Sequence, residues 1–470
     1  MCMDVTLRTL TPLWTGGVDR TMDRIHETSI LGSLRWWYEA IVRGLGGSAC
    51  DPSTHTCPDN DGNYCDVCAV FGATGLQRAF RLEGPEWWNN RRQDRLTVKV
   101  NNNRGWYLGH GYIGEGAFRI VPLRVPAGLT WDDVKQTLLL TLRLIEGWGG
   151  LGPKTQVGYG VVQIELDAAT TIAAFEKLKQ RNNRRMVSQN PQWPALDGFF
   201  FAKVRFKINA NTTPKQWIKE RVTNNIELNE ELDWYLNGAG DTQRKAVLPL
   251  APIVRYHLRT LIRNNIQYNG RPNAPARWHL MGVISGLWHQ QDFGKIVEKW
   301  QCPECNHQWD HFPKKEEHEN CKGTPKKVSL CLNCPKKWKP KQAVKAPSTR
   351  HISRKGSLIH VSHAYPVNDD GQDGQWEFRI WGWIPETLPG NVSRNKVLNY
   401  LRRWLGVQQQ RHRHQPQNGA LWSALNMTPT QVCWFERQEQ EQEKEVADYL
   451  KALLKGCEET SHGGTENTGR

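Results

Sequence analysis

The sequence predicts an α+β fold in which one order of elements, strand, helix, two strands, helix, strand, occurs twice. Met3, Val5 and Leu7 alternate with polar residues, which is typical of a half-buried strand. Apolar residues then recur at helical spacing through two long segments, and a second alternating strand begins after residue 198. The length of 470 residues also exceeds what one hydrophobic core normally supports, so two domains are expected.

Residues 1–167 contain the clearer copy of this order. Thr28 or Ser29 can cap the first helix, and Thr130 with Asp133 resembles a capping box before the second. This order is the split βαβ, ferredoxin-like pattern that RNA-recognition modules share. The elements expected here are strands at 3–7, 97–100, 117–123 and 161–166 and helices at 28–45 and 131–146.

Residues 198–455 are expected to repeat the order in a degenerate form, after a linker at 168–197. An insertion at 298–346 interrupts this copy, and the polar tail 456–470 is expected to be disordered. The prediction is therefore tandem ferredoxin-like (RRM-like) βαββαβ domains with a zinc-ribbon-like insertion in the second. The elements expected here are strands at 203–208, 358–367 and 376–384 and helices at 216–236, 250–263, 394–405 and up to 454.

The charge balance points to an anionic partner. The net charge is +15 and the pI is near 9.3, which favours a nucleic acid or an acidic membrane surface. No segment approaches the ~20 apolar residues that span a bilayer, and the first ten residues lack the apolar core of a signal peptide. We therefore expect a cytoplasmic protein without membrane contact, whose 12 cysteines stay reduced and bind metal.

The insertion carries the cysteine spacing most typical of zinc. Two Cys-x-x-Cys pairs can close a tetrahedron of thiolates, and the Lys- and Pro-rich surroundings offer no core that would fold without metal. Four ligands leave no open position, so the zinc would be structural; the alternative is four unligated thiols in a loop. The predicted ligands are Cys302, Cys305, Cys331 and Cys334, and the residues that can replace one are Cys321, His307, His311 and His318.

A second cysteine cluster near the N-terminus gives a weaker signal. Cys50, Cys57, Cys65 and Cys68 include only one Cys-x-x-Cys pair, so a second zinc site here is one of two open interpretations. The other is that Cys68, followed by apolar residues, is a buried core thiol.

A glycine-rich segment at 147–160 is a candidate for contact with an RNA backbone. Gly149, Gly150 and Gly152 allow close approach of a ligand and expose N–H groups, and Lys154 adds a positive charge. The segment lacks the Gly-Lys-Ser/Thr motif of nucleotide hydrolases. A purely structural turn is the alternative.

Basic side chains on helices are further candidates for RNA contact. Arg255, Arg259 and Arg263 recur every four residues, and Arg35 adjoins Trp36 and Trp37. Cations beside aromatic rings suit phosphate contact and base stacking. A solvated helix face is the alternative reading of this stripe.

His26 is the one residue that suggests catalysis. A histidine can act as general base in RNA cleavage, but the sequence shows no partner lysine or tyrosine for it.

Four sequence strings carry a further signal: Leu10–Gly17, Glu27–Trp37, Cys65–Gly75 and the loop Gly147–Gly160. Together they resemble the first RAMP subunit of the type III-B CRISPR effector, the Cmr complex. The resemblance implies tandem ferredoxin-like domains and a non-catalytic subunit in antiviral defence. Its partners would be the 3′ region of the guide RNA, the target RNA and other RAMP subunits. Implied RNA contacts are Ser33, Arg35, Gly149, Gly150, Gly152 and Lys154, beside the stripe residues Arg255 and Arg259.

Two other functions stay open at this point. The first is a RAMP-type endoribonuclease that processes repeat RNA with His26 as general base. The second is a zinc-dependent protein adaptor whose basic surface is incidental.

Overall fold

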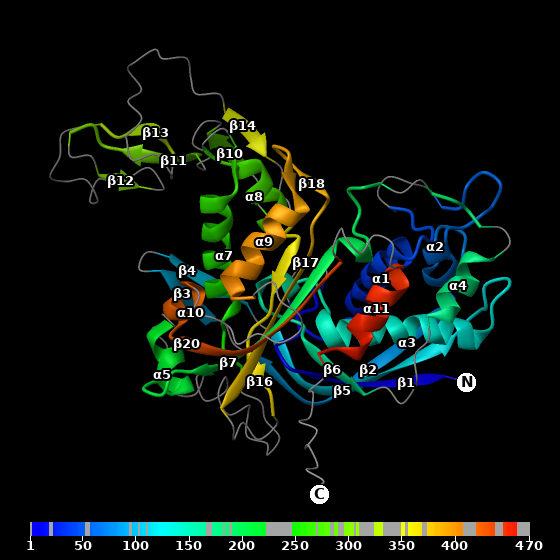
Figure 1. Cartoon of the computed structure of the whole chain (residues 1–470). Helices are drawn as coiled ribbons and strands as arrows, with labels where there is room; N and C mark the ends of the chain where they lie inside the picture. Colours follow the sequence, from blue (N-terminus) through cyan, green and yellow to red (C-terminus); the bar gives the residue numbers. More distant parts are fainter. Residues whose placement is uncertain are drawn as a thin grey trace, which may run out of the picture. The chain divides into compact units, whose positions relative to one another are not determined.

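The computed structural model divides the chain into two compact units, residues 1–265 with 359–470 and residues 266–358 (Figure 1). The second unit contains the expected insertion at 298–346. The structure describes all residues except 1, 18–21, 52–56, 94–95, 102–103, 110, 166–171, 182–183, 188–189, 222–246, 269–270, 283–285, 290–295, 305–306, 310–323, 332–348, 353–355, 369–373, 408–419, 438–444 and 458–470.

The first sheet contains the strand at the N-terminus and three later strands. They are β1 (Met3–Thr9), β2 (Phe80–Gln93), β5 (Gly111–Pro122) and β6 (Val162–Glu165), in the order β2-β5-β1-β6. All neighbours are antiparallel. Met3, Val5 and Leu7 are buried, which confirms the alternation predicted for the first strand.

Helices α1 (Glu27–Gly44) and α3 (Trp131–Trp148) pack together on one face of this sheet (Figure 1). The capping box is confirmed, because Thr130 and Asp133 exchange both bonds at the start of α3. The expected cap of α1 is wrong: the helix begins after His26, whose side chain forms no capping bond. Shorter elements are α2 (Asp66–Phe71), the 3₁₀ turn η1 (Thr155–Val157) and α4 (Ala173–Lys179).

The strand expected at 97–100 exists, but it lies outside the main sheet. It is β3 (Leu96–Asn101), and it pairs with β4 (Arg104–Leu108) in a separate two-stranded ladder. β2, which the sequence analysis did not predict, occupies the expected place beside β5. The hydrophobic pattern alone did not distinguish a strand of the sheet from one of an inserted hairpin.

The second sheet repeats the strand order of the first. Its strands are β7 (Phe199–Ile208), β15 (Ile359–Val361), β17 (Gln375–Trp383) and β20 (Met427–Glu436), in the order β15-β17-β7-β20. All neighbours are again antiparallel, and β16 (Tyr365–Pro366) also pairs with β17. The mixed α and β class is thus confirmed. β20 was not predicted.

Helices α7 (Ala251–Asn265) and α9 (Arg394–Leu405) pack against each other, and α7 also contacts β15 of this sheet (Figure 1). The helix expected at 216–236 is described only up to residue 221. The remaining elements are η2 (Leu196–Gly198), α5 (Pro214–Arg221), β18 (Thr387–Leu388), β19 (Val392–Ser393), α10 (Ala420–Leu425) and α11 (Val446–Lys455).

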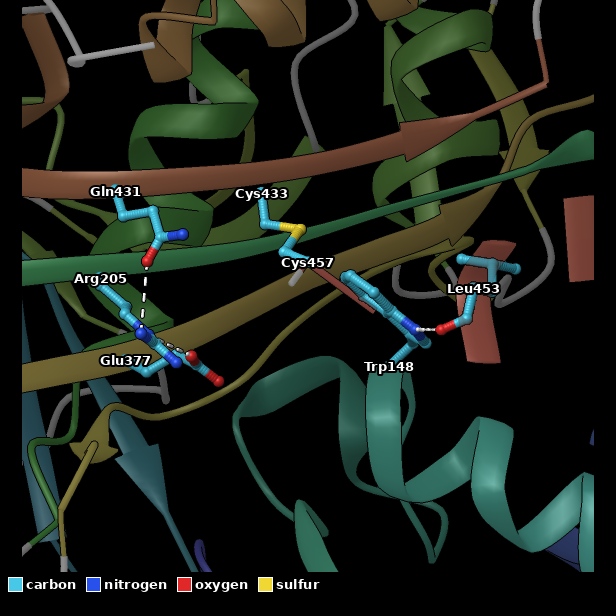
Figure 2. Close-up of a disulfide and its surroundings, with 7 residues drawn as sticks. All are labelled: Trp148, Arg205, Glu377, Gln431, Cys433, Leu453 and Cys457. Atoms are coloured by element: carbon cyan, nitrogen blue, oxygen red, sulfur yellow. Dashed lines mark hydrogen bonds and ion pairs between the residues drawn. A yellow bond between two sulfur atoms is a disulfide. The ribbon is translucent and has the colours of Figure 1, made fainter. Parts of the chain in front are cut away.

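Two contacts join the C-terminal segment with α11 to the rest of the first unit, one to α3 and one to the second sheet. The indole Nε1 of Trp148, at the end of α3, donates a hydrogen bond of 2.7 Å to the carbonyl of Leu453 (Figure 2). Cys433 on β20 forms a disulfide with Cys457, just beyond α11 (Figure 2). The expectation that all cysteines are reduced is therefore wrong for this pair.

An ionic network around the buried side chains of Glu377 and Arg379 is formed by strands of the second sheet. Glu377 accepts a hydrogen bond from Arg205 at 3.2 Å, and Arg205 also donates to Gln431 (Figure 2). The hydroxyl of Tyr365 donates a second bond to Glu377 at 2.6 Å. Arg379 extends the network, since it bonds Tyr365 and the carbonyl of Glu146 at the end of α3. Through these bonds, α3, which packs on the first sheet, is connected to β17 of the second sheet.

The described residues of the second unit form small sheets and one helix. A three-stranded sheet has the order β12-β11-β13, and β10 pairs with β14. The elements are β8 (Gln267–Tyr268), β9 (Arg271–Pro272), α8 (Ala274–Met281), β10 (Gly286–His289), β11 (Ile296–Gln301), β12 (Gln308–Trp309), β13 (Lys326–Cys331) and β14 (Thr349–Ile352).

Among the helices that the structure describes, none combines the length and the apolar character needed to cross a membrane.

Candidate functional site

A pocket of about 350 Å³ lies within the first unit, where α1, the glycine-rich segment and the second sheet meet. It brings together residues that are far apart in the sequence. Its lining consists of Ser29, Gly32, Ser33, Trp36, Trp37, Gly150, Gly152, Pro153, Thr155, His360 and Trp381. Of the predicted RNA contacts, Ser33, Gly150 and Gly152 therefore lie in one site.

The glycine-rich segment is fixed to α1 by two hydrogen bonds. The N–H of Gly152 donates to Ser33 Oγ at 2.8 Å, and Trp37 Nε1 donates to the carbonyl of Gly150 at 3.2 Å. A Cβ on Gly149 would lie 2.4 Å from the Trp37 ring. Gly152 has φ +82, and a Cβ there would lie 2.4 Å from the carbonyl oxygen of Trp14. These glycines are thus needed for the close packing that shapes the pocket wall.

His360 on β15 and Trp381 on β17 are the residues of the second sheet in the pocket lining. Thr155 Oγ1 and His360 Nδ1 are 2.9 Å apart, and the His360 ring stacks on Trp381 with centroids at 5.3 Å. Burial, aided by the charge of Arg255, lowers the pKa of His360 to about 3, so the ring is neutral. The sequence analysis missed both residues, because no local pattern distinguishes them from core positions of a strand.

Lys154 lies close to the pocket but is not part of its lining. Its Nζ is 4.1 Å from the centroid of the Trp14 ring and 5.9 Å from that of Tyr159. Burial lowers the pKa of this amine. Lys154 is thus a partly desolvated cation held over aromatic rings at the edge of the glycine-rich segment.

The predicted arginine stripe on α7 is interrupted by burial. Arg255 is only 2% exposed, donates to the carbonyl of Ile359 at 2.8 Å, and has a pKa that burial lowers to about 9. Its burial argues against a phosphate contact. Arg259 and Arg263 are exposed on the same helix.

The N-terminal cysteine cluster is the second candidate site. Cys50, Cys57, Cys65 and Cys68 are all buried, and their sulfur atoms all lie within 4.8 Å of one another. Cys50 follows the end of α1, whereas Cys65 and Cys68 belong to the start of α2. The buried carboxylate of Asp66 anchors that start through ion pairs with two arginines, Arg181 and Arg184.

The distances in this cluster fit a tetrahedral metal ion. Cys50 Sγ is 3.5 Å from Cys68 Sγ and 3.6 Å from Cys65 Sγ. Four thiolates about 2.3 Å from a zinc ion would have sulfur atoms about 3.8 Å apart. Hydrogen bonds from the thiol of Cys65 and, to a smaller extent, from that of Cys68 lower the pKa of Cys50 to about 4. The same interaction with Cys50 raises the pKa of Cys68. This buried group can therefore hold a metal ion.

Arg35 faces this cluster. Its guanidinium bonds Glu39 Oε1 at 2.9 Å, the carbonyl of Gly72 at 3.4 Å and Cys68 Sγ at 3.5 Å. A ligand set of four thiolates around a divalent cation carries a net negative charge, which this arginine offsets. The contact of Arg35 with RNA stays a prediction.

The predicted ligands of the insertion are only partly described. The register of β11 and β13 places the backbone of Cys331 opposite Ile296, whereas Cys302 follows the other end of β11. Six residues of strand span on the order of 20 Å, so this register does not bring the backbones of Cys302 and Cys331 together. The other predicted ligands and three of the four substitutes lie outside the described residues: Cys305, Cys334, His311, His318 and Cys321.

His26 has a carboxylate partner that the sequence analysis did not identify. His26 Nε2 lies 2.7 Å from Asp23 Oδ1, and this bond is the main cause that lowers the pKa of Asp23. The hydroxyl of Tyr112 donates to the carbonyl of Asp23 at 2.8 Å. The pair lies at the start of α1, the helix that lines the pocket.

Comparison with solved structures yields only distant likenesses. A chain of the cryo-EM structure of the type III-B Cmr-beta bound to cognate target RNA is 14% identical, with a TM-score of 0.22 over 36% of this chain and 55% of that one. The crystal structure of Cmr1 from Pyrococcus furiosus is 13% identical, with a TM-score of 0.26 over 43% and 66%. Cas6 from Thermus thermophilus is 18% identical, with a TM-score of 0.21 over 34% and 53%. The chain thus spans between half and two thirds of the length of these proteins.

The sequence comparisons are more specific. No curated protein matches the chain. Residues 6–163 match the RAMP superfamily, and this range runs from β1 to β6, across the first sheet, the pocket-lining helix α1 and the glycine-rich segment. This part of the chain is therefore similar to the RAMP superfamily.

Proposed function

We propose that this chain is a non-catalytic RNA-binding subunit of a type III-B CRISPR ribonucleoprotein effector. One observation carries the proposal: the glycine-rich segment and the start of α1, both part of the RAMP-superfamily match, form one wall of an aromatic pocket. The sequence strings that resemble the first RAMP subunit of that effector lie in the same region. The proposed ligands are the 3′ region of the guide RNA and the target RNA, and the proposed protein partners are other RAMP subunits.

Tandem ferredoxin-like domains are part of this proposal. In each four-strand order, β2-β5-β1-β6 and β15-β17-β7-β20, the strand that comes first in the sequence lies between the third and the fourth. Helices follow the first and the third strand in both cases, as expected of a split βαβ unit. We also propose that the metal of the N-terminal cysteine cluster is structural zinc, because a Cys₄ set leaves no position open for a substrate. The proposed location is the cytoplasm.

Affinity purification tests the proposed function. The tagged full-length chain would be isolated from the cells that produce it, with mass spectrometry of the proteins and sequencing of the RNA that accompany it. Guide RNA derived from CRISPR repeats, together with several other RAMP proteins, is the expected result. Recovery of the chain without RNA or RAMP proteins would contradict the proposal.

A second candidate function is a RAMP-type endoribonuclease that processes repeat RNA. The observation in its favour is the 2.7 Å bond between His26 and Asp23, because a carboxylate can orient a histidine that acts as general base. Recovery of the chain with cleaved repeat RNA alone would favour this function.

A further inference from the structure

The described lining of the pocket offers no charge to a phosphate. It consists of tryptophans, glycines, hydroxyl residues, one proline and one histidine. The histidine, His360, is neutral because burial lowers its pKa to about 3. A phosphate that entered would lose its hydration without gaining a cation, which is unfavourable. The pocket chemistry therefore suits an uncharged group.

Aromatic rings provide flat surfaces around this space. His360 stacks on Trp381 with an interplanar angle of 16°, and the ring of Trp36 lies 6.3 Å from His360. Trp36 is held edge-on against Trp37 at 5.0 Å and against Phe199 at 5.7 Å, so its orientation is fixed by packing. Rigid aromatic faces bind planar rings at a low cost in conformational entropy.

Polar groups beside these rings can read the edge of a planar ligand. His360 Nδ1 is engaged with Thr155 Oγ1 at 2.9 Å, which leaves the Nε2 side of the neutral ring to donate or accept one hydrogen bond. The volume of about 350 Å³ lies at the small end of the range for small-molecule sites, about 300–1,000 Å³. One base with its sugar fits this space better than a stack of bases does.

We propose that the pocket receives one unpaired nucleobase of the bound RNA, which stacks on the aromatic side chains while its phosphates remain outside. Proteins that read single-stranded RNA commonly bind unstacked bases on aromatic side chains. Lys154, outside the lining but close to the glycine-rich segment, is placed to contact the backbone of the same strand. This inference rests on the proposed RNA-binding function and adds the position and chemical class of one subsite.

Gly32 allows a test that does not damage the fold. It lies on α1 in the pocket lining, and a Cβ built on it meets nothing within 4 Å. Gly32→Leu would fill the pocket from a helical position where leucine is also the better helix former. Gly32→Ala fills less of the space and should cause a smaller loss. Ala173→Leu, at an exposed position of α4, is the control for a new surface leucine.

The measurement is the affinity of the full-length variants for a single-stranded RNA, at several salt concentrations. Base stacking on aromatic side chains contributes about 5- to 150-fold in affinity. We expect Gly32→Leu and Trp36→Ala each to lose affinity within this range, Trp36→Phe to recover part of it, and Ala173→Leu to bind like wild type. The salt dependence should be unchanged in all variants, because no phosphate contact is removed.

The outcomes separate this inference from the proposed function. Wild-type affinity in both Gly32→Leu and Trp36→Ala, with RNA binding intact, would overturn the nucleobase pocket and leave the proposed function in place. A loss accompanied by a weaker salt dependence would also overturn it, because phosphate contacts would then be involved. Failure of the wild-type chain to bind any RNA would remove the proposed function and this subsite with it.

Discussion

The backbone N–H of Gly152 donates a hydrogen bond to the side chain of Ser33 across 2.8 Å, although the two residues are 119 positions apart. Ser33 Oγ in turn donates to the carbonyl of Ser29, one helical turn earlier. One hydroxyl group therefore connects the glycine-rich segment to α1. The shape of the pocket depends on this contact, because both partners belong to its lining.

Ser33→Ala should destabilise the chain and loosen this wall of the pocket. Gly152 is buried, and an unsatisfied buried N–H costs about 1–3 kcal/mol, so we expect a loss of this size in the free energy of unfolding. Urea unfolding of the full-length chain measures it. Ser29→Ala, on the same helix, should change the free energy of unfolding by less than about 0.5 kcal/mol. Equal effects of the two substitutions would contradict the clamp.

The N-terminal cysteine cluster should bind about one zinc ion per chain, because four thiolates complete one tetrahedral site. Cys50→Ser and Cys68→Ser should each abolish this binding and lower the melting temperature. The zinc content of purified protein and the absorption spectrum after substitution with Co²⁺ provide the measurement. Cys2→Ser, at an exposed cysteine, is the matched control. Full zinc content at this site in Cys68→Ser would contradict the prediction. Cys302→Ser tests the insertion separately.

The two cysteine clusters show which parts of a site can be predicted from sequence. Spacing favoured the insertion, since two Cys-x-x-Cys pairs are a local signal. In the N-terminal cluster, Cys50 follows α1 and Cys65 and Cys68 lie at the start of α2, so the approach of their sulfur atoms depends on how these two helices pack together. Local patterns do not encode such long-range approach.

The same limit applies to the rest of the molecule. The strand at the N-terminus and α3 with its capping box followed from local periodicity, and α9 has the bounds 394–405 that its pattern predicted. His360 and Trp381 could not be assigned to the pocket, because their role arises from the packing of the second sheet against the glycine-rich segment. The sequence likewise did not indicate that Arg255 is buried, because the exposed Arg259 and Arg263 recur on the helix at the same spacing.

Stability should rise between about pH 8 and pH 10 because of Lys203. Burial, with repulsion from Arg379, lowers its pKa to about 8, against the opposing effect of Glu377. A lysine in an unfolded chain titrates near about 10.4. Between these values the unfolded chain binds a proton that the folded chain does not, so the free energy of unfolding increases with pH. Below pH 8 the destabilisation is fully present.

Lys203→Met should remove most of this pH dependence. A shift of about two pKa units corresponds to about 3 kcal/mol, and we expect roughly 1–3 kcal/mol because the residue keeps some exposure. Urea unfolding at pH 7.5, 8.5 and 9.5, with wild type and variant side by side, measures the difference. Parallel curves for the two proteins would show that Lys203 is not the source.

Lys154 and Arg35 should differ in what their loss affects. Lys154→Ala should lower RNA affinity by about 1 kcal/mol and reduce the salt slope by about one, as expected for one phosphate contact. Arg35→Ala should chiefly weaken the retention of zinc, since its guanidinium lies 3.5 Å from Cys68 Sγ. RNA titrations and zinc release to a chelator distinguish the two. Lys154→Arg, which retains the charge, should bind RNA nearly like wild type. An Arg35→Ala variant with normal zinc retention would contradict the assignment.

The chain should not cleave RNA on its own, even though His26 and Asp23 form a close pair. General-base catalysis needs the histidine within hydrogen-bond reach of the group it deprotonates, together with a group that stabilises the leaving oxygen. Asp23 can orient His26, but it cannot stabilise the leaving oxygen, because a carboxylate repels the negative charge that develops there. Incubation of repeat RNA with the full-length chain and EDTA, followed by gel analysis, should leave the RNA intact. Specific cleavage that is lost in His26→Ala and weakened in Asp23→Asn would establish the endoribonuclease instead, because contaminating nucleases would not respond to these substitutions.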